Sequence, residues 1–339
     1  MAKIVSLASG MIQTLEIKNY KSIKHLQMNC KRVNVFIGEP NAGKSNIVEA
    51  LGILSPGFTE NFSELTRVKN ASELFFDFQT NEPIILSSGQ FNYSISYTKS
   101  NNAFRLEISE IHNSDDRAND KKNIEEYWNN FQMDASNYRA EIKSKFRYYK
   151  FKNIEFNDDI RGYLHPPYGD NIPELLLTNK ELRNSVLQIF RDKGFKLNLK
   201  PRENEIHISK DTDEDLYISY AFDAASETLR RIFFLNLAIK SNKDSILLFD
   251  ELEANTFPFY TKYFAETIAL DETNQYFFTT HNPYLLMSLV EKTKVEDLNI
   301  CIARMENYET KVYPLRPEQF SEALDLGPDI FYNLDSFID

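Results

Sequence analysis

A single short segment constrains the fold of this chain more than any other feature. It carries glycine at its first and sixth positions, followed by lysine and serine, which is the full phosphate-loop pattern. The segment consists of Gly38, Glu39, Pro40, Asn41, Ala42, Gly43, Lys44 and Ser45. Backbone amides of such a loop converge on phosphate oxygens at a helix N-terminus. We expect Lys44 to neutralise the β- and γ-phosphates, the Ser45 hydroxyl to bind Mg²⁺, and Asn46 to add a further nucleotide contact.

The residues on either side of this loop supply the context that it needs. Val33 to Gly38 is an apolar run that ends in glycine and predicts a buried strand. After the loop, the apolar residues Ile47, Val48, Leu51 and Leu54 fall on one face of a helix. A chance glycine-rich turn would lack both neighbours. The sequence therefore predicts an α/β fold that binds ATP with Mg²⁺.

A second apolar run ends in two acidic residues. Ser245 to Phe249 predicts a buried strand, and Asp250 follows at its carboxyl end. We expect Asp250 to hold Mg²⁺ through water and Glu251 to orient or deprotonate the water that attacks the γ-phosphate. The alternative is that the two acidic residues are only a solvated pair at a strand end. The phosphate loop argues against this alternative, because such a loop requires an acidic partner strand.

A third strand ends in a histidine. Gln275 to Thr280 predicts this strand, and His281 lies 31 residues beyond Asp250. A lone histidine is more often structural than catalytic. At the tip of the strand after the acidic one, however, His281 is placed to contact the γ-phosphate and sense its presence.

The rest of the chain predicts three sections. Alternation of apolar and polar residues predicts a strand at Ile12 to Ile17 and an antiparallel meander within residues 73 to 110, whereas the polar residues 111 to 145 suggest a helical insertion or arm. Helical spacing follows at Leu175 to Phe190 and Thr228 to Ile239. The expected sections are an N-terminal ATPase lobe (1–110), an insertion or arm region (111–220) and a C-terminal ATPase lobe (221–339).

Composition excludes several other classes. The two cysteines, Cys30 and Cys301, are too few for a disulfide framework or a zinc cluster. About 18 consecutive apolar residues would be needed to span a membrane, and no such run occurs, so we expect a cytoplasmic protein without membrane contact. The net charge of −11 disfavours DNA binding, although a local basic patch could still contact DNA.

Together these motifs resemble the ABC-type ATPase heads of the recombination-repair and SMC group, in particular the OLD-like AAA ATPases. Ile12 to Ile23 resembles the opening strand and turn of that group, Phe249 to Asn255 resembles its Asp-Glu-Pro-Glu-Ala-His, and Thr280 to Tyr284 resembles its Thr-His-Ser-Pro. The resemblance covers residues 12 to 58 and 220 to 290. It implies a P-loop NTPase of the ABC/SMC-head type, with a mixed β-sheet core, an antiparallel β subdomain and a helical insertion. It also implies a homodimer or higher oligomer that hydrolyses ATP.

The chain departs from that group in its signature segment. Where related heads have Ser-x-Gly before a helix, residues 224 to 231 contain no glycine. In the group, this segment of one protomer covers the γ-phosphate bound by the other, and Ser226 is the residue placed to do so here. Glu227 would bring negative charge near that phosphate, for which Arg230 or Arg231 could compensate. The alternative is that Ser226 is only a helix N-cap.

A glutamine usually links the nucleotide to the arm in these heads. Gln79 is the best candidate for this residue and for a further Mg²⁺ ligand, with an ordinary polar residue at a strand end as the alternative. Leu252 and Asn255 replace the proline and histidine of the group, changes that we expect to be tolerated.

The resemblance also bears on partners. OLD proteins carry a Toprim nuclease after the ATPase, yet about 55 residues follow His281, fewer than the ~100 of a typical domain. We therefore expect a separate effector, a Toprim or HNH nuclease, as in bacterial anti-phage systems of the PARIS or Septu kind. The alternatives are a nucleotide-dependent scaffold that traps a partner with little turnover, and a DNA repair clamp.

Overall fold

The computed structural model describes residues 11–55, 66–89, 91–100, 103–110, 124–129, 132–133, 145–211 and 217–338. Its strands are β1 (Thr14–Tyr20), β2 (Ile23–Asn29), β3 (Val33–Ile37), β4 (Ile84–Ser87), β5 (Phe91–Thr98), β6 (Ala103–Glu110), β7 (Ile124–Asn129), β8 (Gln132–Met133), β9 (Phe146–Tyr149), β10 (Lys196–Lys200), β11 (Glu205–Asp211), β12 (Tyr217–Ala221), β13 (Ile246–Phe249), β14 (Gln275–Thr279), β15 (Leu298–Glu306) and β16 (Glu309–Pro314). Its α-helices are α1 (Lys44–Gly52), α4 (Ile172–Thr178), α5 (Lys180–Arg191), α6 (Glu227–Lys240), α7 (Pro258–Leu270), α8 (Pro283–Lys292) and α9 (Gln319–Leu326). Within the described ranges, no helix is both long and apolar enough to cross a membrane.

Six strands form the central sheet, in the order β16-β15-β3-β14-β13-β9. The five strands from β15 to β9 pair in parallel, and β16 pairs with β15 in antiparallel fashion at one edge. β3, β14 and β13 consist entirely of buried residues, as expected of parallel strands that are covered on both faces. Because β14 lies between β3 and β13, the carboxyl ends of these three strands meet at one edge of the sheet.

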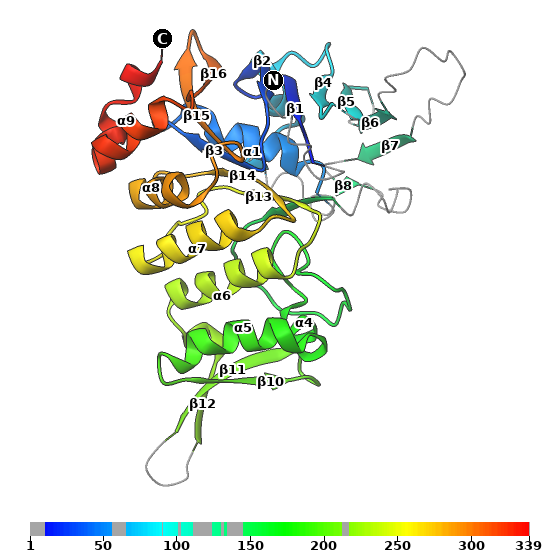
Figure 1. Cartoon of the computed structure of the whole chain (residues 1–339). Helices are drawn as coiled ribbons and strands as arrows, with labels where there is room; N and C mark the ends of the chain where they lie inside the picture. Colours follow the sequence, from blue (N-terminus) through cyan, green and yellow to red (C-terminus); the bar gives the residue numbers. More distant parts are fainter. Residues whose placement is uncertain are drawn as a thin grey trace.

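Two apolar cores cover the two faces of this sheet. On one face, Val33, Val35 and Ile37 of β3 belong to a core built with residues of helices α4 to α8. On the other face, Phe36 belongs to a core that contains α1 and the N-terminal strands. Figure 1 shows α8, α7, α6 and α5 one below another on the helical side. Side chains along β3 thus point alternately into the two cores.

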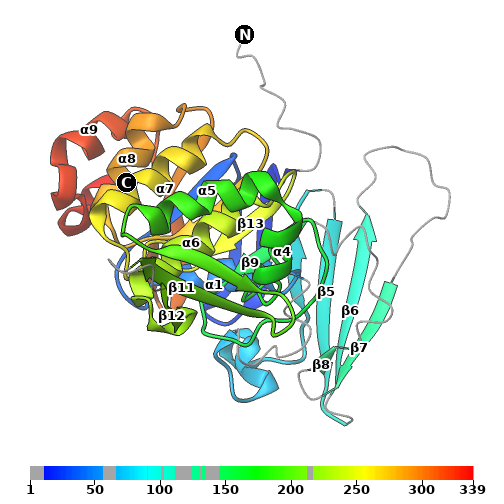
Figure 2. The ribbon, with the colours of Figure 1, turned by 90° about the horizontal axis from the view of Figure 1, so that it is seen from below.

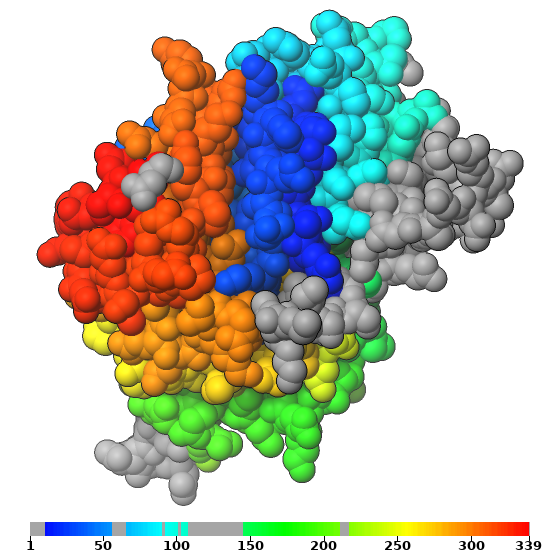
Figure 3. All heavy atoms as spheres, turned by 45° about the horizontal axis from the view of Figure 1, so that its top comes forward, coloured from blue at the N-terminus to red at the C-terminus, as the bar shows by residue number. Residues whose placement is uncertain are grey.

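A second, antiparallel sheet contains the N-terminal strands, in the order β2-β1-β4-β5-β6-β7-β8. It confirms the predicted meander for residues 84 to 110, whereas residues 71–74 and 76–78 form short 3-10 helices. Strands β5, β6 and β7 extend to one side of the molecule, away from the helices (Figure 2). On the face shown in Figure 3, the hairpin of β15 and β16 (orange), the strands β1 and β2 (blue) and the strands β4 to β6 (cyan) lie side by side.

The helical interpretation of residues 111 to 145 is wrong where the structure describes them. Ile124–Asn129 pairs antiparallel with β6 over six residues, and Gln132–Met133 pairs with β7 in turn. The sheet therefore continues beyond residue 110 into the predicted insertion. Residues 124–129 form a strand because they pair with the open edge of β6. A charge-rich strand is compatible with such a peripheral position in the sheet.

The helical section of the middle region lies later in the chain. The predicted helix from Leu175 to Phe190 is interrupted at Asn179, whose side chain accepts a hydrogen bond from the backbone amide of Leu182 and so caps α5. The three-stranded sheet β10-β11-β12 packs beside α5 and leads into α6. This region places the start of α6 at the surface.

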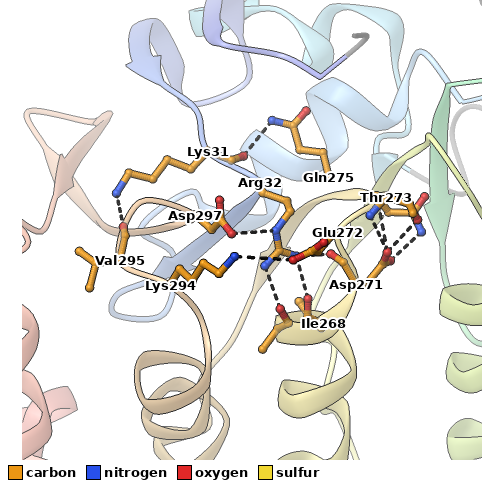
Figure 4. Close-up of polar contacts among 12 residues, drawn as sticks. Lys31, Arg32, Ile268, Asp271, Glu272, Thr273, Gln275, Lys294, Val295 and Asp297 are labelled. Carbon is orange, nitrogen blue, oxygen red and sulfur yellow. Dashed lines mark hydrogen bonds and ion pairs between the residues drawn. The ribbon is translucent and has the colours of Figure 1, made fainter. Parts of the chain in front are cut away.

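A buried arginine holds α7 against the amino end of the central sheet (Figure 4). The guanidinium of Arg32 donates hydrogen bonds to the carbonyl oxygens of Ile268, Ala269 and Asp271 at the C-terminus of α7, and its Nε lies 3.4 Å from Asp297 Oδ2. The last carbonyls of a helix have no partner within the helix, so the cationic side chain satisfies them and complements the helix dipole. This clamp lies at the end of the sheet opposite to the phosphate loop.

Candidate nucleotide-binding site

The phosphate loop joins β3 to α1, as predicted, and it needs both of its glycines. Gly38 has φ 143°, and a Cβ there would lie 2.2 Å from the carbonyl oxygen of Ala303. Gly43 has φ 87°, and a Cβ there would lie 1.9 Å from Thr310 Oγ1. Because L side chains rarely adopt such backbone angles, glycine is required at both positions by conformation as well as by space.

Lys44 is the first residue of α1 and is buried inside the loop. Its Nζ donates hydrogen bonds to the carbonyl oxygen of Gly38 (2.8 Å) and to that of Glu39 (2.7 Å). Burial lowers the pKa of Lys44, and the negative charges of Asp250, Glu251 and Glu39 oppose that shift. The ammonium is thus held at the centre of the loop, within the field of the acidic strand end.

The other loop residues divide into exposed and anchored positions. Glu39, Pro40 and Asn41 are exposed, Ala42 is buried, and Ser45 is half-buried at the helix start. Asn46 Nδ2 donates a hydrogen bond to Ser22 Oγ (2.7 Å), which in turn lies 2.7 Å from Thr310 Oγ1. Asn46 therefore ties the start of α1 to the turn before β2 and to β16. This contact could not be predicted, because its three residues are far apart in the chain.

The strand order gathers the predicted catalytic side chains beside Lys44. Asp250 and Glu251 follow β13, His281 follows β14, and His281 Nε2 lies 4.0 Å from Glu251 Oε1. Burial and the positive charge of Lys44 lower the pKa of His281, while Glu251 and Asp250 act to raise it. The side chains of Glu251 and His281 are 55% and 41% exposed, so both can be reached from outside the chain. Beside Asp250 and Glu251 opens a cavity of about 210 Å³.

A charged cluster around the buried Glu49, which the sequence did not reveal, lies next to Asp250. In α1, Glu49 Oε1 accepts a hydrogen bond from Arg67 Nε (2.8 Å) and lies 2.6 Å from Arg67 Nη2. Glu49 Oε2 accepts a hydrogen bond from Lys21 Nζ. Arg67 also lies 3.9 Å from Asp250 Oδ2. Burial raises the pKa of Glu49 and lowers that of Lys21, in each case against the attraction between the two groups. The cluster connects α1 to the acidic strand end.

Ser226 lies outside this group, at the exposed start of α6. Its Oγ accepts a hydrogen bond from the backbone amide of Leu229 (3.3 Å), which is the N-cap arrangement. Glu227 pairs with Arg231 at 2.8 Å. Arg230 is buried and directs its guanidinium to Ala225, Asp223 and Asn153, so it is not positioned to compensate for Glu227. Within this chain Ser226 thus acts as a cap, and its contact with phosphate stays a prediction.

Gln79 also lies outside the group. It is exposed at the end of a 3-10 helix, and its carbonyl oxygen accepts a hydrogen bond from Asn19 Nδ2 (3.3 Å). Within the described residues, the Gln79 side chain makes no hydrogen bond to the phosphate loop. Its role toward Mg²⁺ stays a prediction.

Fold and site together define a class: the chain is a P-loop NTPase of the ABC/SMC-head type, with phosphate loop, acidic strand end and histidine on adjacent strands. Residues 33–288 match the family described as "AAA domain, putative AbiEii toxin, Type IV TA system". This match spans most of the chain, which therefore belongs to that family. Among curated proteins, no relative of the chain was found.

Solved structures agree on the fold. An Smc head bound to the C-terminal winged-helix domain of ScpA has a TM-score of 0.52 at 16% identity, covering 92% of this chain and 99% of that one. The Smc head with a coiled coil and joint from Pyrococcus yayanosii also has a TM-score of 0.52, at 11% identity, covering 93% of this chain and 99% of that one. At such low identity, the likeness extends to the fold alone.

Proposed function

We propose that this chain is a Mg²⁺-dependent ATPase that closes as a dimer around nucleotide and thereby controls a separate effector protein. The observation that carries the proposal is the gathering of Lys44, Asp250, Glu251 and His281 at the carboxyl edge of one parallel sheet. Nucleotides bind at this edge in open α/β sheets. The match to an AAA-domain family supports the same ligand.

The residues present suit ATP and Mg²⁺. The two glycines let the loop backbone approach a phosphate chain closely, and the buried ammonium of Lys44 supplies charge at its centre. The Ser45 hydroxyl and the Asp250 carboxylate are the hard oxygen donors that Mg²⁺ prefers, and they would hold it. When bound, Mg²⁺ would neutralise phosphate charge. The exposed carboxylate of Glu251 is placed to accept a proton from water, with His281 beside it.

A second copy of the chain completes each site in this proposal. Glu251 and His281 are accessible from outside, so the γ-phosphate side of the site is open in one chain. The exposed N-terminus of α6, with Ser226 as its cap, carries backbone amides and a dipole that favour an anion. In an isologous dimer, each of the two sites would be complete and would contain residues of both chains.

Mixing two inactive variants tests this proposal. Lys44→Ala chains cannot bind nucleotide, and Ser226→Arg chains cannot cover the partner's phosphate. In a mixed dimer, one of the two sites keeps its own Lys44 and receives an intact Ser226, so partial ATPase activity should return. Mass measurement confirms the mixed dimers. Absence of recovery in confirmed mixed dimers would mean that α6 is an ordinary capped helix and that the site is completed in another way.

We further propose that the effector is a nuclease, of the Toprim or HNH class, in a bacterial defence setting. The resemblance to OLD-like ATPases supports this, and the Smc head of similar fold was solved with a domain of a separate protein, ScpA, bound to it. Pull-down of the neighbouring gene product, followed by a nuclease assay with and without ATP, tests the partner. A product that neither binds nor changes its activity with ATP would contradict it.

A nucleotide-dependent scaffold is the second candidate. Glu227 supports it, because this exposed carboxylate next to Ser226, although paired with Arg231, would place negative charge near a partner's phosphate and slow hydrolysis. The two candidates differ in Glu251→Gln. This variant abolishes the output of an ATPase that works by turnover, whereas a scaffold keeps assembly and partner capture.

A further inference from the structure

Thr279, the last residue of β14, is buried beneath the proposed catalytic residues and contacts two of them. Its Oγ1 accepts a hydrogen bond from the backbone amide of Glu251 (2.7 Å) and donates one to Asp250 Oδ1 (2.8 Å). Since an amide can act only as a donor, the hydroxyl proton must point to the carboxylate. A single hydroxyl therefore fixes both acidic residues at the end of β13.

The backbone of Glu251 requires such a restraint. Its φ is 52°, which lies in the left-handed region that a residue with a side chain adopts only at a cost. The amide on one side is held by Thr279 Oγ1, and the carbonyl oxygen on the other accepts a hydrogen bond from the Ala254 amide (2.9 Å). These two bonds keep the exposed carboxylate of Glu251 turned toward His281.

A second contact joins the same two segments. Glu253 is buried, and its Oε1 accepts a hydrogen bond from the backbone amide of His281 (2.9 Å). Burial raises the pKa of Glu253, and the bond from the His281 amide opposes that shift. The turn after β13 and the end of β14 are thus connected at Thr279 and at His281.

From these contacts we propose that Thr279 is a positioning residue for ATP hydrolysis: its hydroxyl holds Glu251 in the left-handed conformation and Asp250 in a fixed orientation beside it. The inference rests on the proposed ATPase function. Thr279 is 1% exposed, so it acts through its two neighbours without touching the nucleotide. It therefore acts on the rate of hydrolysis, whereas at saturating Mg²⁺ the affinity for ATP depends on Lys44 and the loop.

Two substitutions at this position separate the hydroxyl from the side-chain shape. Thr279→Val keeps the shape and removes both hydrogen bonds, whereas Thr279→Ser keeps the hydroxyl. For the valine variant we expect kcat to fall by about tenfold to a hundredfold, as the loss of two hydrogen bonds implies, with KM and ATP affinity changed by less than about twofold. The serine variant should recover most of the rate. If Thr279 had only a structural role, Thr279→Val would change thermal unfolding without lowering kcat at an unchanged KM.

Hydrogen exchange at the Glu251 amide provides a readout that is independent of turnover. The amide should exchange faster in Thr279→Val than in the unchanged chain, and Thr279→Ser should keep its protection. Wild-type kcat in a folded valine variant overturns the inference and leaves the ATPase proposal standing. If the unchanged chain does not hydrolyse ATP, the ATPase proposal fails, and unaltered exchange at Glu251 in the valine variant then overturns the positioning role as well.

Discussion

Replacing Glu49 by glutamine tests the charged cluster beside Asp250. The Glu49 side chain is 1% exposed and forms ion pairs with Lys21 and Arg67. The side chain of Lys21 is 12% exposed and that of Arg67 is 54% exposed. The contact with Arg67 is largely screened by water, so it contributes about 0–1 kcal/mol. Lys21 is different, because in Glu49→Gln its buried ammonium would lose its anionic partner and keep only neutral acceptors such as the Thr66 carbonyl. We expect Glu49→Gln to lower the free energy of unfolding by about 3 kcal/mol, the lower range for breaking a buried ion pair.

The pKa directions add a second expectation. Burial dominates the pKa shifts of both Glu49 and Lys21, which means that their mutual attraction does not fully offset desolvation. Removing both charges should therefore restore most of the lost stability. Urea unfolding of Glu49→Gln, Lys21→Met and the double variant forms a double-mutant cycle. A cost below about 1 kcal/mol for Glu49→Gln, or additive losses in the double variant, would refute this reasoning.

The same substitution should affect Mg²⁺. Without the Glu49 charge, the nearby carboxylate left to Arg67 is that of Asp250, which lies 3.9 Å away. The guanidinium would then compete with the cation for Asp250. We expect a higher Mg²⁺ concentration for half-maximal ATPase activity in Glu49→Gln. An unchanged Mg²⁺ requirement would mean that Arg67 does not move.

Three further predictions follow from single residues. Lys44→Ala should abolish ATP binding in calorimetry, because several phosphate charges lose their main cationic partner, and unchanged affinity would contradict this role. Arg32→Leu should cost about 2–4 kcal/mol in urea unfolding, since three carbonyls at the end of α7 and Asp297 lose their donor; Arg32→Lys should recover part of it, and a cost near zero would show the clamp to be irrelevant. His281 has a lowered pKa, so its contribution to stability is present above its ordinary value of about 6.5 and is lost as the pH falls through the lowered value. In His281→Asn, the free energy of unfolding should depend less on pH over that range. An identical pH dependence in both proteins would contradict the shift.

The phosphate loop, Asp250, Glu251 and the position of His281 could be predicted because short-range sequence decides them. A glycine-rich turn between a buried strand and a helix, and polar residues at the ends of two buried strands, are visible within a few residues. Parallel pairing then brings those strand ends together without further information. The α/β fold class follows from the same pattern and is confirmed.

The contacts that support the site could not be predicted, because they join residues far apart in the chain. Thr279 lies 29 residues from Asp250, and Glu49 lies 18 residues from Arg67, with no periodicity to connect either pair. The strand at Ile124–Asn129 was also missed, since its two glutamates obscure alternation and pairing with β6 decides its structure. Supporting contacts of this kind depend on tertiary structure and leave little trace in local sequence.

The central claim is that nucleotide closes two copies of this chain around a site containing Lys44 and Glu251. Sedimentation of the Glu251→Gln variant with and without Mg²⁺ and ATP tests it most directly, with Lys44→Ala as the matched control. We expect Glu251→Gln to bind ATP without hydrolysing it and to shift to a dimer only when both ligands are present, whereas Lys44→Ala should not shift. Wild-type hydrolysis by Glu251→Gln, or the same mass for both variants with and without nucleotide, would contradict it.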